Sequence, residues 1–308
     1  MSKKWSISIP ASTANLGPGF DSIGIALDKY LELEVELAVE WKIDNLSENL
    51  PIVPNPQDHL IVQAAQKTAQ MHGLILPACH VKASSEIPLA RGMGSSASAI
   101  VAGIELANQV LALELSSHDK LKVATLMEGH PDNAAASIFG GFTISSSAEN
   151  GEIHVFHAYH IDASFVLFIP NFELKTEAAR NVLPESYTRK VSAQASATAN
   201  LLTAAFLSQS FEQAGIYMEQ DLFHEPYRLD LIPQSREIKA QAKKAGAFGT
   251  CISGAGPTLL SLVQKGTEEE FVSKLNGIFP DFDLVPVTIN RTGIVVSKNK
   301  KGSAILVH

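Results

Sequence analysis

Four short segments of the chain combine glycine with polar side chains that can do chemistry. Residues 88–99 read Pro-Leu-Ala-Arg-Gly-Met-Gly-Ser-Ser-Ala-Ser-Ala, and apolar residues then recur every three or four positions from Ala97 to Leu111. This spacing predicts a helix that begins with Ser95 or Ser96 as its N-cap. Glycines let backbone N–H groups approach an anion, and a helix start adds unpaired N–H donors with partial positive charge. The segment therefore predicts a phosphate-binding loop.

The other three segments are residues 10–21, 128–134 and 253–258. The first places Asn15 and Asp21 around two glycines, and the second reads Glu-Gly-His-Pro-Asp-Asn-Ala. A carboxylate of the second segment could join one serine hydroxyl on Mg²⁺, which takes few protein ligands when phosphate supplies oxygens. The third reads Ser-Gly-Ala-Gly-Pro-Thr between two apolar stretches. Alone, each is also typical of an ordinary turn or helix cap.

The phosphate loop has a rival interpretation as a dinucleotide fingerprint. Gly92-x-Gly94-x-x-Ala97 fits that pattern, with Glu114 about 20 residues downstream to bind a ribose. A dinucleotide fold, however, needs a buried strand that ends at the first glycine, and Pro88 intervenes here. The sequence also contains neither a Gly-x-x-x-x-Gly-Lys-Ser/Thr loop nor the Asp-Phe-Gly of protein kinases. A nucleoside triphosphate is the favoured ligand.

Periodic stretches surround these four segments. Strands are predicted at residues 5–9, 26–39, 79–87, 142–145, 165–169, 248–252, 258–263 and 284–289, and helices at 58–72, 95–113, 120–128, 191–208, 211–222, 235–245 and 267–279. Strands that alternate with helices predict an α+β protein with two layers in each half. The polar stretch 145–152 predicts a boundary between an N-terminal domain over residues 1–150 and a C-terminal domain over residues 151–308.

Composition narrows the class of protein. The chain has 308 residues, 45% of them hydrophobic, which suits about two globular domains. A formal net charge of -8 argues against nucleic acid as a partner. We find no apolar run of membrane-spanning length and no signal-peptide core, and the two cysteines lack metal-ligand spacing. We expect a cytoplasmic enzyme with small-molecule substrates and no membrane partner; a homodimer is compatible with the sequence but not indicated by it.

Three of the segments together resemble the motifs of a known family. Residues 10–21, 88–97 and 253–258 are similar, in this order, to the motifs of the GHMP small-molecule kinases, named for galactokinase, homoserine kinase, mevalonate kinase and phosphomevalonate kinase. Met93 replaces the usual leucine, which conserves volume. The resemblance implies a two-domain α+β fold, in which a mixed-sheet N-terminal domain with helices packs against a ferredoxin-like C-terminal domain. Nucleotide and acceptor would lie in the cleft between them.

The resemblance also implies an acceptor. The pattern Pro-Ala-x-x-Ala-Asn-Leu-Gly-x-Gly-Phe-Asp at residues 10–21 is most similar to the branch that phosphorylates L-homoserine, with ATP and Mg²⁺, in threonine biosynthesis. Asp21 would bind the ammonium group, and Arg180 with Arg228 the carboxylate, since a guanidinium pairs with a carboxylate in bidentate fashion. The substrate-binding set is completed by Asn15, His130 and Thr176. Outside the motif context, both arginines would be interpreted as solvated surface charges.

The remaining roles follow from the same resemblance. The predicted ATP-binding set is Pro88, Leu89, Ala90, Arg91, Gly92, Met93, Gly94, Ser95, Ser96, Ala97, Ser98, Gly254 and Gly256. Ser96 (or Ser95 in a shifted register) and Glu128 are expected to hold Mg²⁺. Asn133 stands where mevalonate-kinase relatives carry an aspartate, and an asparagine cannot accept a proton. The predicted catalytic set is therefore Asn15, Arg180 and Asn133, without a general base. Phosphoryl transfer asks mainly for positioning and charge neutralisation; Asp132 as a base is the less favoured alternative.

Overall fold

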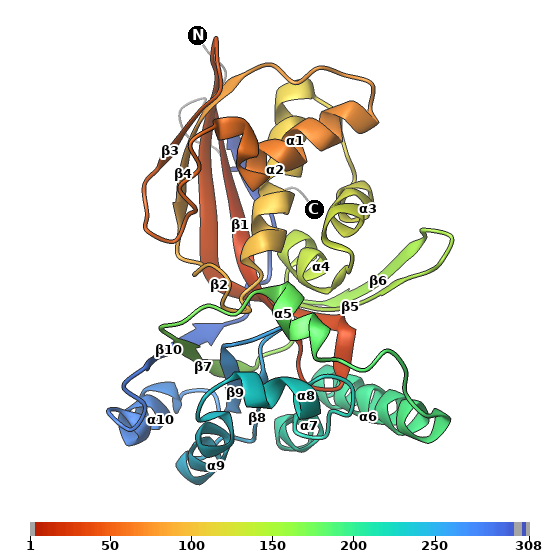
Figure 1. The fold of residues 1–308 in the computed structure, drawn as a ribbon, viewed down its shortest axis with the longest axis vertical. Helices are drawn as coiled ribbons and strands as arrows, with labels where there is room; N and C mark the ends of the chain where they lie inside the picture. Colours follow the sequence, from red (N-terminus) through yellow and green to blue (C-terminus); the bar gives the residue numbers. More distant parts are fainter. Residues whose placement is uncertain (1–3, 299–303, 306–308) are drawn as a thin grey trace.

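The computed structural model describes residues 4–298 and 304–305. It consists of two parts stacked along the long axis, each a β-sheet with the helices that cover it (Figure 1). We call these two parts the first and the second layer. The first layer holds an eight-stranded sheet in the order β12-β11-β1-β2-β4-β3, to which the hairpin of β5 and β6 is added through β2. Its strands are β1 (Lys4–Asn15), β2 (Gly19–Leu37), β3 (Lys42–Asn45), β4 (Cys79–Ser85), β5 (Phe142–Ser147), β6 (Ile153–Ala158), β11 (Val295–Lys298) and β12 (Ala304–Ile305).

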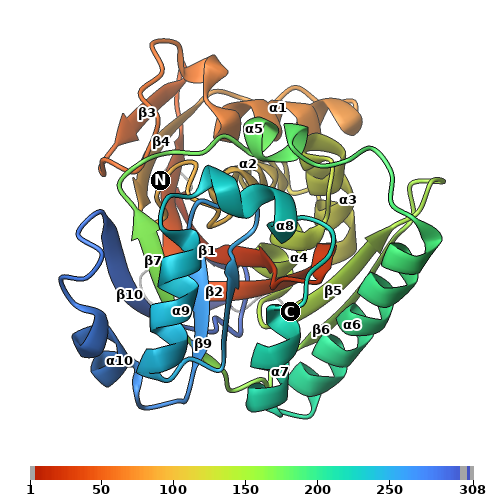
Figure 2. The same ribbon diagram turned by 60° about the horizontal axis from the view of Figure 1, so that its bottom comes forward.

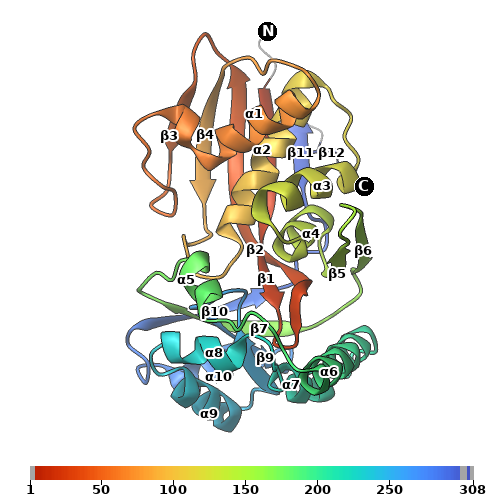
Figure 3. The same ribbon diagram turned by 45° about the vertical axis from the view of Figure 1, so that its right-hand side comes forward.

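Helices cover one face of this sheet, and the other face is open to solvent along residues 4–8 of β1 and 28–37 of β2 (Figure 3). Along β2, Leu31, Leu33 and Val35 are buried, whereas Glu32 and Glu34 between them are exposed. Such alternation is what a half-covered sheet requires, because successive side chains point to opposite faces. The covering helices are α1 (Leu60–Met71), α2 (Ser95–Leu111), α3 (Ser117–Glu128) and α4 (Asp132–Phe139), and a short 3₁₀ turn, η1 (Pro56–Asp58), precedes α1.

The second layer holds an antiparallel sheet in the order β10-β7-β9-β8. Its strands are β7 (Ser164–Pro170), β8 (Gly249–Ile252), β9 (Leu259–Val263) and β10 (Phe282–Thr288). Figure 2 shows its larger helices, α6 (Arg189–Leu207), α7 (Phe211–Met218), α9 (Ser235–Ala245) and α10 (Glu268–Leu275). Two short helices, α5 (Thr176–Asn181) and α8 (Glu225–Arg228, followed by the 3₁₀ turn η2 at Leu229–Leu231), complete this layer. The strand order is ferredoxin-like, as predicted.

The core continues from one layer into the other through β7. Phe165 and Leu167 belong to the large core of the first sheet, while Val166 and Phe168 pack under α9 and α10. A strand buried on both faces reads as a continuous apolar run, which is how 165–169 appears in the sequence. None of the helices in the described residues combines the length and apolar character needed to cross a bilayer.

Several local predictions are wrong for identifiable reasons. Neither Ser95 nor Ser96 caps α2; Gly94 does, in a left-handed conformation with φ of 69° that only glycine adopts at little cost. The helix expected over residues 58–72 begins at Leu60, with His59 as its N-cap through the side chain. Helix α4 was missed because Gly129 ends α3 and the helical pattern restarts only three residues later.

The polar stretch 145–152 forms the end of β5 and the turn of the β5–β6 hairpin. Strand β6 was not predicted, because Phe156 at an exposed position and His157 at a half-buried one break the apolar–polar alternation of its sequence. Both β6 and the C-terminal β11 pair within the first sheet. The two sheets therefore do not follow the division predicted at residue 150.

Candidate active site

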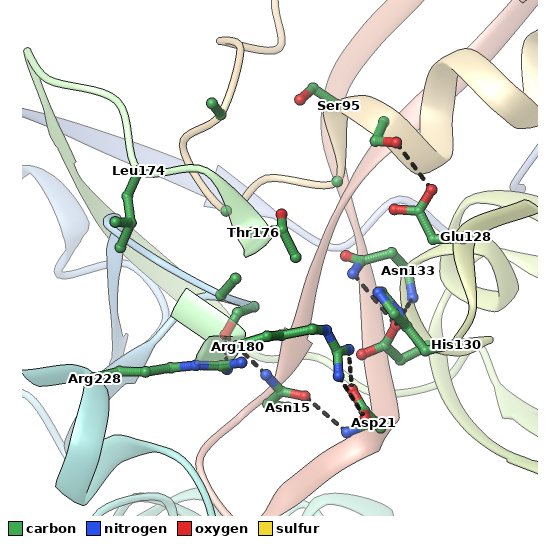
Figure 4. A pocket seen from close by; sticks show the side chains of 17 residues that line it. Asn15, Asp21, Ser95, Glu128, His130, Asn133, Leu174, Thr176, Arg180 and Arg228 are labelled. Atoms are coloured by element: carbon green, nitrogen blue, oxygen red, sulfur yellow. Dashed lines mark hydrogen bonds and ion pairs between the residues drawn. The ribbon is translucent and has the colours of Figure 1, made fainter. Parts of the chain in front are cut away.

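One pocket at the junction of the two layers gathers most of the predicted site residues (Figure 4). The first layer contributes the β1–β2 turn, the phosphate loop and the facing ends of α3 and α4. The second layer contributes α5, α8 and the turn at residues 253–256. All predicted substrate-binding residues line the pocket, namely Asn15, Asp21, His130, Thr176, Arg180 and Arg228, and so do Ser96, Glu128 and Asn133.

The phosphate loop turns at two glycines that no other residue could replace without strain. Gly92 and Gly94 have φ of 74° and 69°, and a Cβ would overlap the Ser253 carbonyl oxygen at the first and the Ser12 hydroxyl at the second. No hydrogen bond among the described residues uses the backbone N–H of Gly92, Gly94 or Ser95. Together with the start of α2, these groups can receive an anion. Because β4 ends at Ser85, no strand runs into Gly92, as a dinucleotide fold would require.

The turn at residues 253–256 supports this loop from the second layer. The Ser253 hydroxyl lies 2.6 Å from the carbonyl oxygen of Gly92, and the N–H of Gly254 donates to the carbonyl of Ala14 at 3.0 Å. Of the predicted ATP-binding residues, Ala90, Gly92, Gly94, Ser95, Ser96 and Gly254 line the pocket; Pro88, Leu89, Arg91, Met93, Ala97, Ser98 and Gly256 do not. Met93 is in the core, and Arg91 turns its guanidinium to the carbonyl of Pro170.

Ser96 and Glu128 meet across the pocket wall. The Ser96 hydroxyl donates to Glu128 Oε2 at 2.9 Å, and burial raises the pKa of the Glu128 carboxyl. A hydroxyl and a partly desolvated carboxylate beside free N–H donors fit Mg²⁺, which prefers oxygen ligands. Asp21, His130 and Asp132 also have ligand atoms within 4.8 Å of one another. Those atoms are already engaged in the ion pairs described next, so Ser96 and Glu128 fit the ion better.

Asp21 and Arg180 form an ion pair with each other. Arg180 Nη2 donates to Asp21 Oδ1 at 2.7 Å and Nη1 to Oδ2 at 3.2 Å. Burial alone would lower the pKa of Arg180, but its bonds to Asp21 outweigh burial and the pKa is raised. The predicted ligand for an ammonium group thus neutralises a predicted ligand for a carboxylate. An α-amino acid carries both charges and can replace both partners at once.

Arg228 has no such partner. Its side chain is 1% exposed, and its Nε donates to the carbonyl of Ala179 at 2.9 Å. No carboxylate of the described residues lies within 4.0 Å of its guanidinium. Burial and the neighbouring charge of Arg180 lower the pKa of Arg228 to about 10. A buried cation at a pocket wall without an anion favours an anionic ligand.

The two asparagines are held by the protein itself. Asn15 Nδ2 donates to the carbonyl of Gly254 at 2.8 Å, and its Oδ1 accepts the backbone N–H of Asp21 at 3.0 Å. Asn133 Oδ1 accepts the Ser12 hydroxyl at 3.0 Å. These bonds make Asn15 a link between the layers, and they leave only the remaining N–H groups of both amides for a ligand.

Asp132 was considered only as a base, yet it orients its neighbours. It is 2% exposed, and its Oδ1 accepts from His130 Nδ1 at 2.6 Å and from the backbone N–H of Asn133 at 2.7 Å. Burial would lower the pKa of His130, but the bond to Asp132 outweighs it and the pKa is raised. Leu174 and Ala255, which also line the pocket, were missed because they carry no reactive group.

A second, mostly apolar pocket of about 170 Å³ lies on the other side of the phosphate loop and shares Ser95 and Ser96 with the first. It is lined by Leu50, Ile87, Leu89 and other residues, His59 among them. His59 Nδ1 accepts the N–H of Ile61 at 3.3 Å, so the proton is on Nε2, which is buried without a partner. His59 was missed in the sequence, since a histidine before an apolar helix is usually structural.

Known proteins share both halves of this chain. Residues 59–141 match the sequence model of the GHMP kinases N terminal domain, and residues 202–281 match that of the GHMP kinases C terminal. The homoserine kinase of Oceanobacillus iheyensis is 49% identical over 295 residues, which is 95% of this chain and 98% of that one. The homoserine kinase of Bacillus velezensis is 46% identical over 295 residues, covering 96% and 95%. A crystal structure of homoserine kinase from Cytophaga hutchinsonii, 27% identical, superimposes with a TM-score of 0.81 over 96% of this chain and 97% of its own.

Proposed function

The chain belongs to the GHMP kinase family, and from this premise we propose that it transfers the γ-phosphate of ATP to the side-chain hydroxyl of L-homoserine. The product is O-phospho-L-homoserine, an intermediate of threonine biosynthesis, which the homoserine kinase relatives support. The observation that carries the proposal is the pairing of a free anion-binding loop with a pocket that contains Asp21, Arg180 and Arg228. We propose the cytoplasm as the place of action.

The charges of the pocket match an amino-acid alcohol. The ammonium group of homoserine would take the place of Arg180 beside Asp21, and its carboxylate would lie between Arg180 and Arg228. Mevalonate lacks the ammonium group, and galactose lacks both charges. Galactose would leave the buried Arg228 without an anion, which costs several kcal/mol, and mevalonate would draw Arg180 toward its carboxylate without giving Asp21 another cation. The Arg228 guanidinium, already without an anion, makes that cost largest for an acceptor without a carboxylate.

The nucleotide would span the two pockets. Its phosphates fit the free N–H groups of the phosphate loop, and its base fits the apolar pocket behind that loop, where the buried Nε2–H of His59 can donate to a ring nitrogen. Burial lowers the pKa of His59, so the ring is neutral and offers a hydrogen bond without a charge. Ser96 and Glu128 would hold Mg²⁺, which supplies charge neutralisation at the phosphates when bound.

We propose that this pocket catalyses the transfer by alignment of the reactants. Asn133 cannot accept a proton from the hydroxyl, and Asp132 is bonded to His130 and to the backbone. In this proposal, Arg180, Asn15 and Asn133 hold the acceptor in a fixed position relative to the phosphate loop. The hydroxyl proton passes to a phosphate oxygen, in keeping with a loose transition state that needs little help from a base.

The experiment is ADP release from ATP and Mg²⁺ with homoserine, threonine, serine, mevalonate and galactose as acceptors. We expect the highest kcat/KM with homoserine. A higher value with any other acceptor contradicts the substrate assignment. As a control against the dinucleotide interpretation, titration with NADH should leave its fluorescence unchanged.

A further inference from the structure

Phe20 contacts both predicted carboxylate ligands. The guanidinium carbon of Arg228 lies 5.4 Å from the centre of the Phe20 ring, and that of Arg180 lies 5.8 Å from it. At such distances the negative face of an aromatic ring attracts a cation. Phe20 comes from β2, Arg180 from α5 and Arg228 from α8. One ring thus joins the first layer to the two short helices that carry the arginines.

The ring itself is held by His224. The two rings stack at a centroid distance of 5.3 Å with an angle of 22°, and His224 Nε2 lies 2.9 Å from the carbonyl oxygen of Gly17. Burial lowers the pKa of His224, so the imidazole is neutral and Nε2–H donates to Gly17. The stacking therefore fixes Phe20 without adding a third positive charge beside the arginines.

Two guanidinium groups held close together repel each other in a pocket that is partly screened from water. Asp21 compensates one of them, and Arg228 has no carboxylate among the described residues. The aromatic face of Phe20 contacts both guanidinium groups and adds negative potential to that of Asp21 and Asp132, whose charges also act on both arginines. A carboxylate that enters between the two guanidinium groups would then find its donors already placed.

We propose that Phe20 is a positioning residue that determines specificity for the acceptor's carboxylate, because its ring holds the guanidinium groups of Arg180 and Arg228 side by side. The proposal rests on the proposed function, since it requires an acceptor with a carboxylate. Phe20 acts through the two arginines and touches no reacting atom. Its effect is confined to ligands that carry a carboxylate, which separates it from simple packing.

The test compares Phe20→Leu, which keeps an apolar side chain but removes the aromatic face, with Phe20→Tyr, which retains it. The matched control is Phe223→Leu. The Phe223 ring lies 6.4 Å from that of Phe20 and has neither arginine over it. Two ligands are titrated into each protein by calorimetry: L-2-aminobutyrate, which has both charges of homoserine and no hydroxyl, and 3-aminopropan-1-ol, which lacks the carboxylate. The KM values for homoserine and ATP are measured alongside.

For Phe20→Leu we expect the Kd of L-2-aminobutyrate and the KM for homoserine to rise about 5- to 30-fold. The Kd of 3-aminopropan-1-ol and the KM for ATP should stay within about twofold. Phe20→Tyr and Phe223→Leu should behave like the unaltered protein. Equal losses with both ligands, or no loss with either, overturn the proposal.

The proposed function can fail separately from this inference. An unaltered protein that binds L-2-aminobutyrate in a Phe20-dependent way, yet does not phosphorylate homoserine, refutes the function and leaves the role of Phe20 standing. Failure of the unaltered protein to bind L-2-aminobutyrate at all refutes both.

Discussion

Replacing Arg228 by methionine should weaken the binding of the acceptor strongly and change the free energy of unfolding only slightly. Burial and the charge of Arg180 lower the pKa of Arg228 from 12.5 to about 10, which corresponds to roughly 3 kcal/mol for holding this charge in the empty protein. A bound carboxylate removes that penalty. Without the guanidinium, acceptor binding should therefore weaken by about 3 kcal/mol, or roughly 100-fold in kcat/KM for homoserine.

The empty protein should respond differently to Arg228→Met. It is relieved of a poorly solvated charge but loses the hydrogen bonds from Arg228 to the carbonyl groups of Ala179 and Gly254. Each such bond contributes about 1 kcal/mol, so the free energy of unfolding should change by less than about 2 kcal/mol.

Steady-state kinetics and urea unfolding measure the two effects, with the exposed Arg236→Met as the control that alters neither. A parallel rise in the KM for ATP refutes this reasoning. So does a loss of 3–5 kcal/mol in stability, about what breaking a buried ion pair costs.

Three further outcomes follow from the same contacts. Glu128→Gln should raise the Mg²⁺ concentration for half-maximal activity at least about 10-fold while the KM for homoserine stays unchanged, and equal effects on both would contradict a metal role. Lys239→Met should lower the free energy of unfolding by about 3 kcal/mol, because it leaves the buried Glu225 carboxylate uncompensated. Glu225 raises the pKa of Lys239 against the effect of burial. The difference in free energy of unfolding between the unaltered protein and Lys239→Met should therefore be full at pH 7 and shrink only above about pH 10.5. A difference that already shrinks below pH 9 speaks against the ion pair. Burial lowers the pKa of His59 below its unfolded value, so stability should fall as the pH drops through about 6.5, by up to about 1.4 kcal/mol per pH unit, and less steeply in His59→Asn; equal slopes would show that His59 is not responsible.

The elements that short-range patterns specify could be predicted from the sequence. The apolar spacing from Ala97 to Leu111 placed α2, and the helix predicted at 120–128 is found as α3, which a capping box of Ser116 and Asp119 begins. The order of three glycine motifs was enough to identify the family. These features depend on residues that are neighbours in the chain, where the geometry of a strand or helix translates directly into spacing.

Contacts between distant segments could not be predicted in the same way. Asp21 and Arg180 are 159 positions apart, and their ion pair depends on how α5 settles against β2. The resemblance named both residues for opposite charges of a substrate, but nothing in the sequence indicated that they pair with each other. The unpartnered Nε2 of His59 likewise becomes evident only in the folded chain, where His59 lines the same pocket as Ser95 and Ser96 of the phosphate loop. Burial creates these features, and burial is a property of the assembled fold.

The most direct measurement of the central claim is the product itself. The protein is incubated with ATP, Mg²⁺ and L-homoserine, and the products are identified by mass spectrometry and phosphorus NMR. We predict one O-phospho-L-homoserine for each ADP, with the phosphate on the side-chain oxygen. ADP without a phosphorylated acceptor, or phosphate on the carboxyl group, would contradict the account.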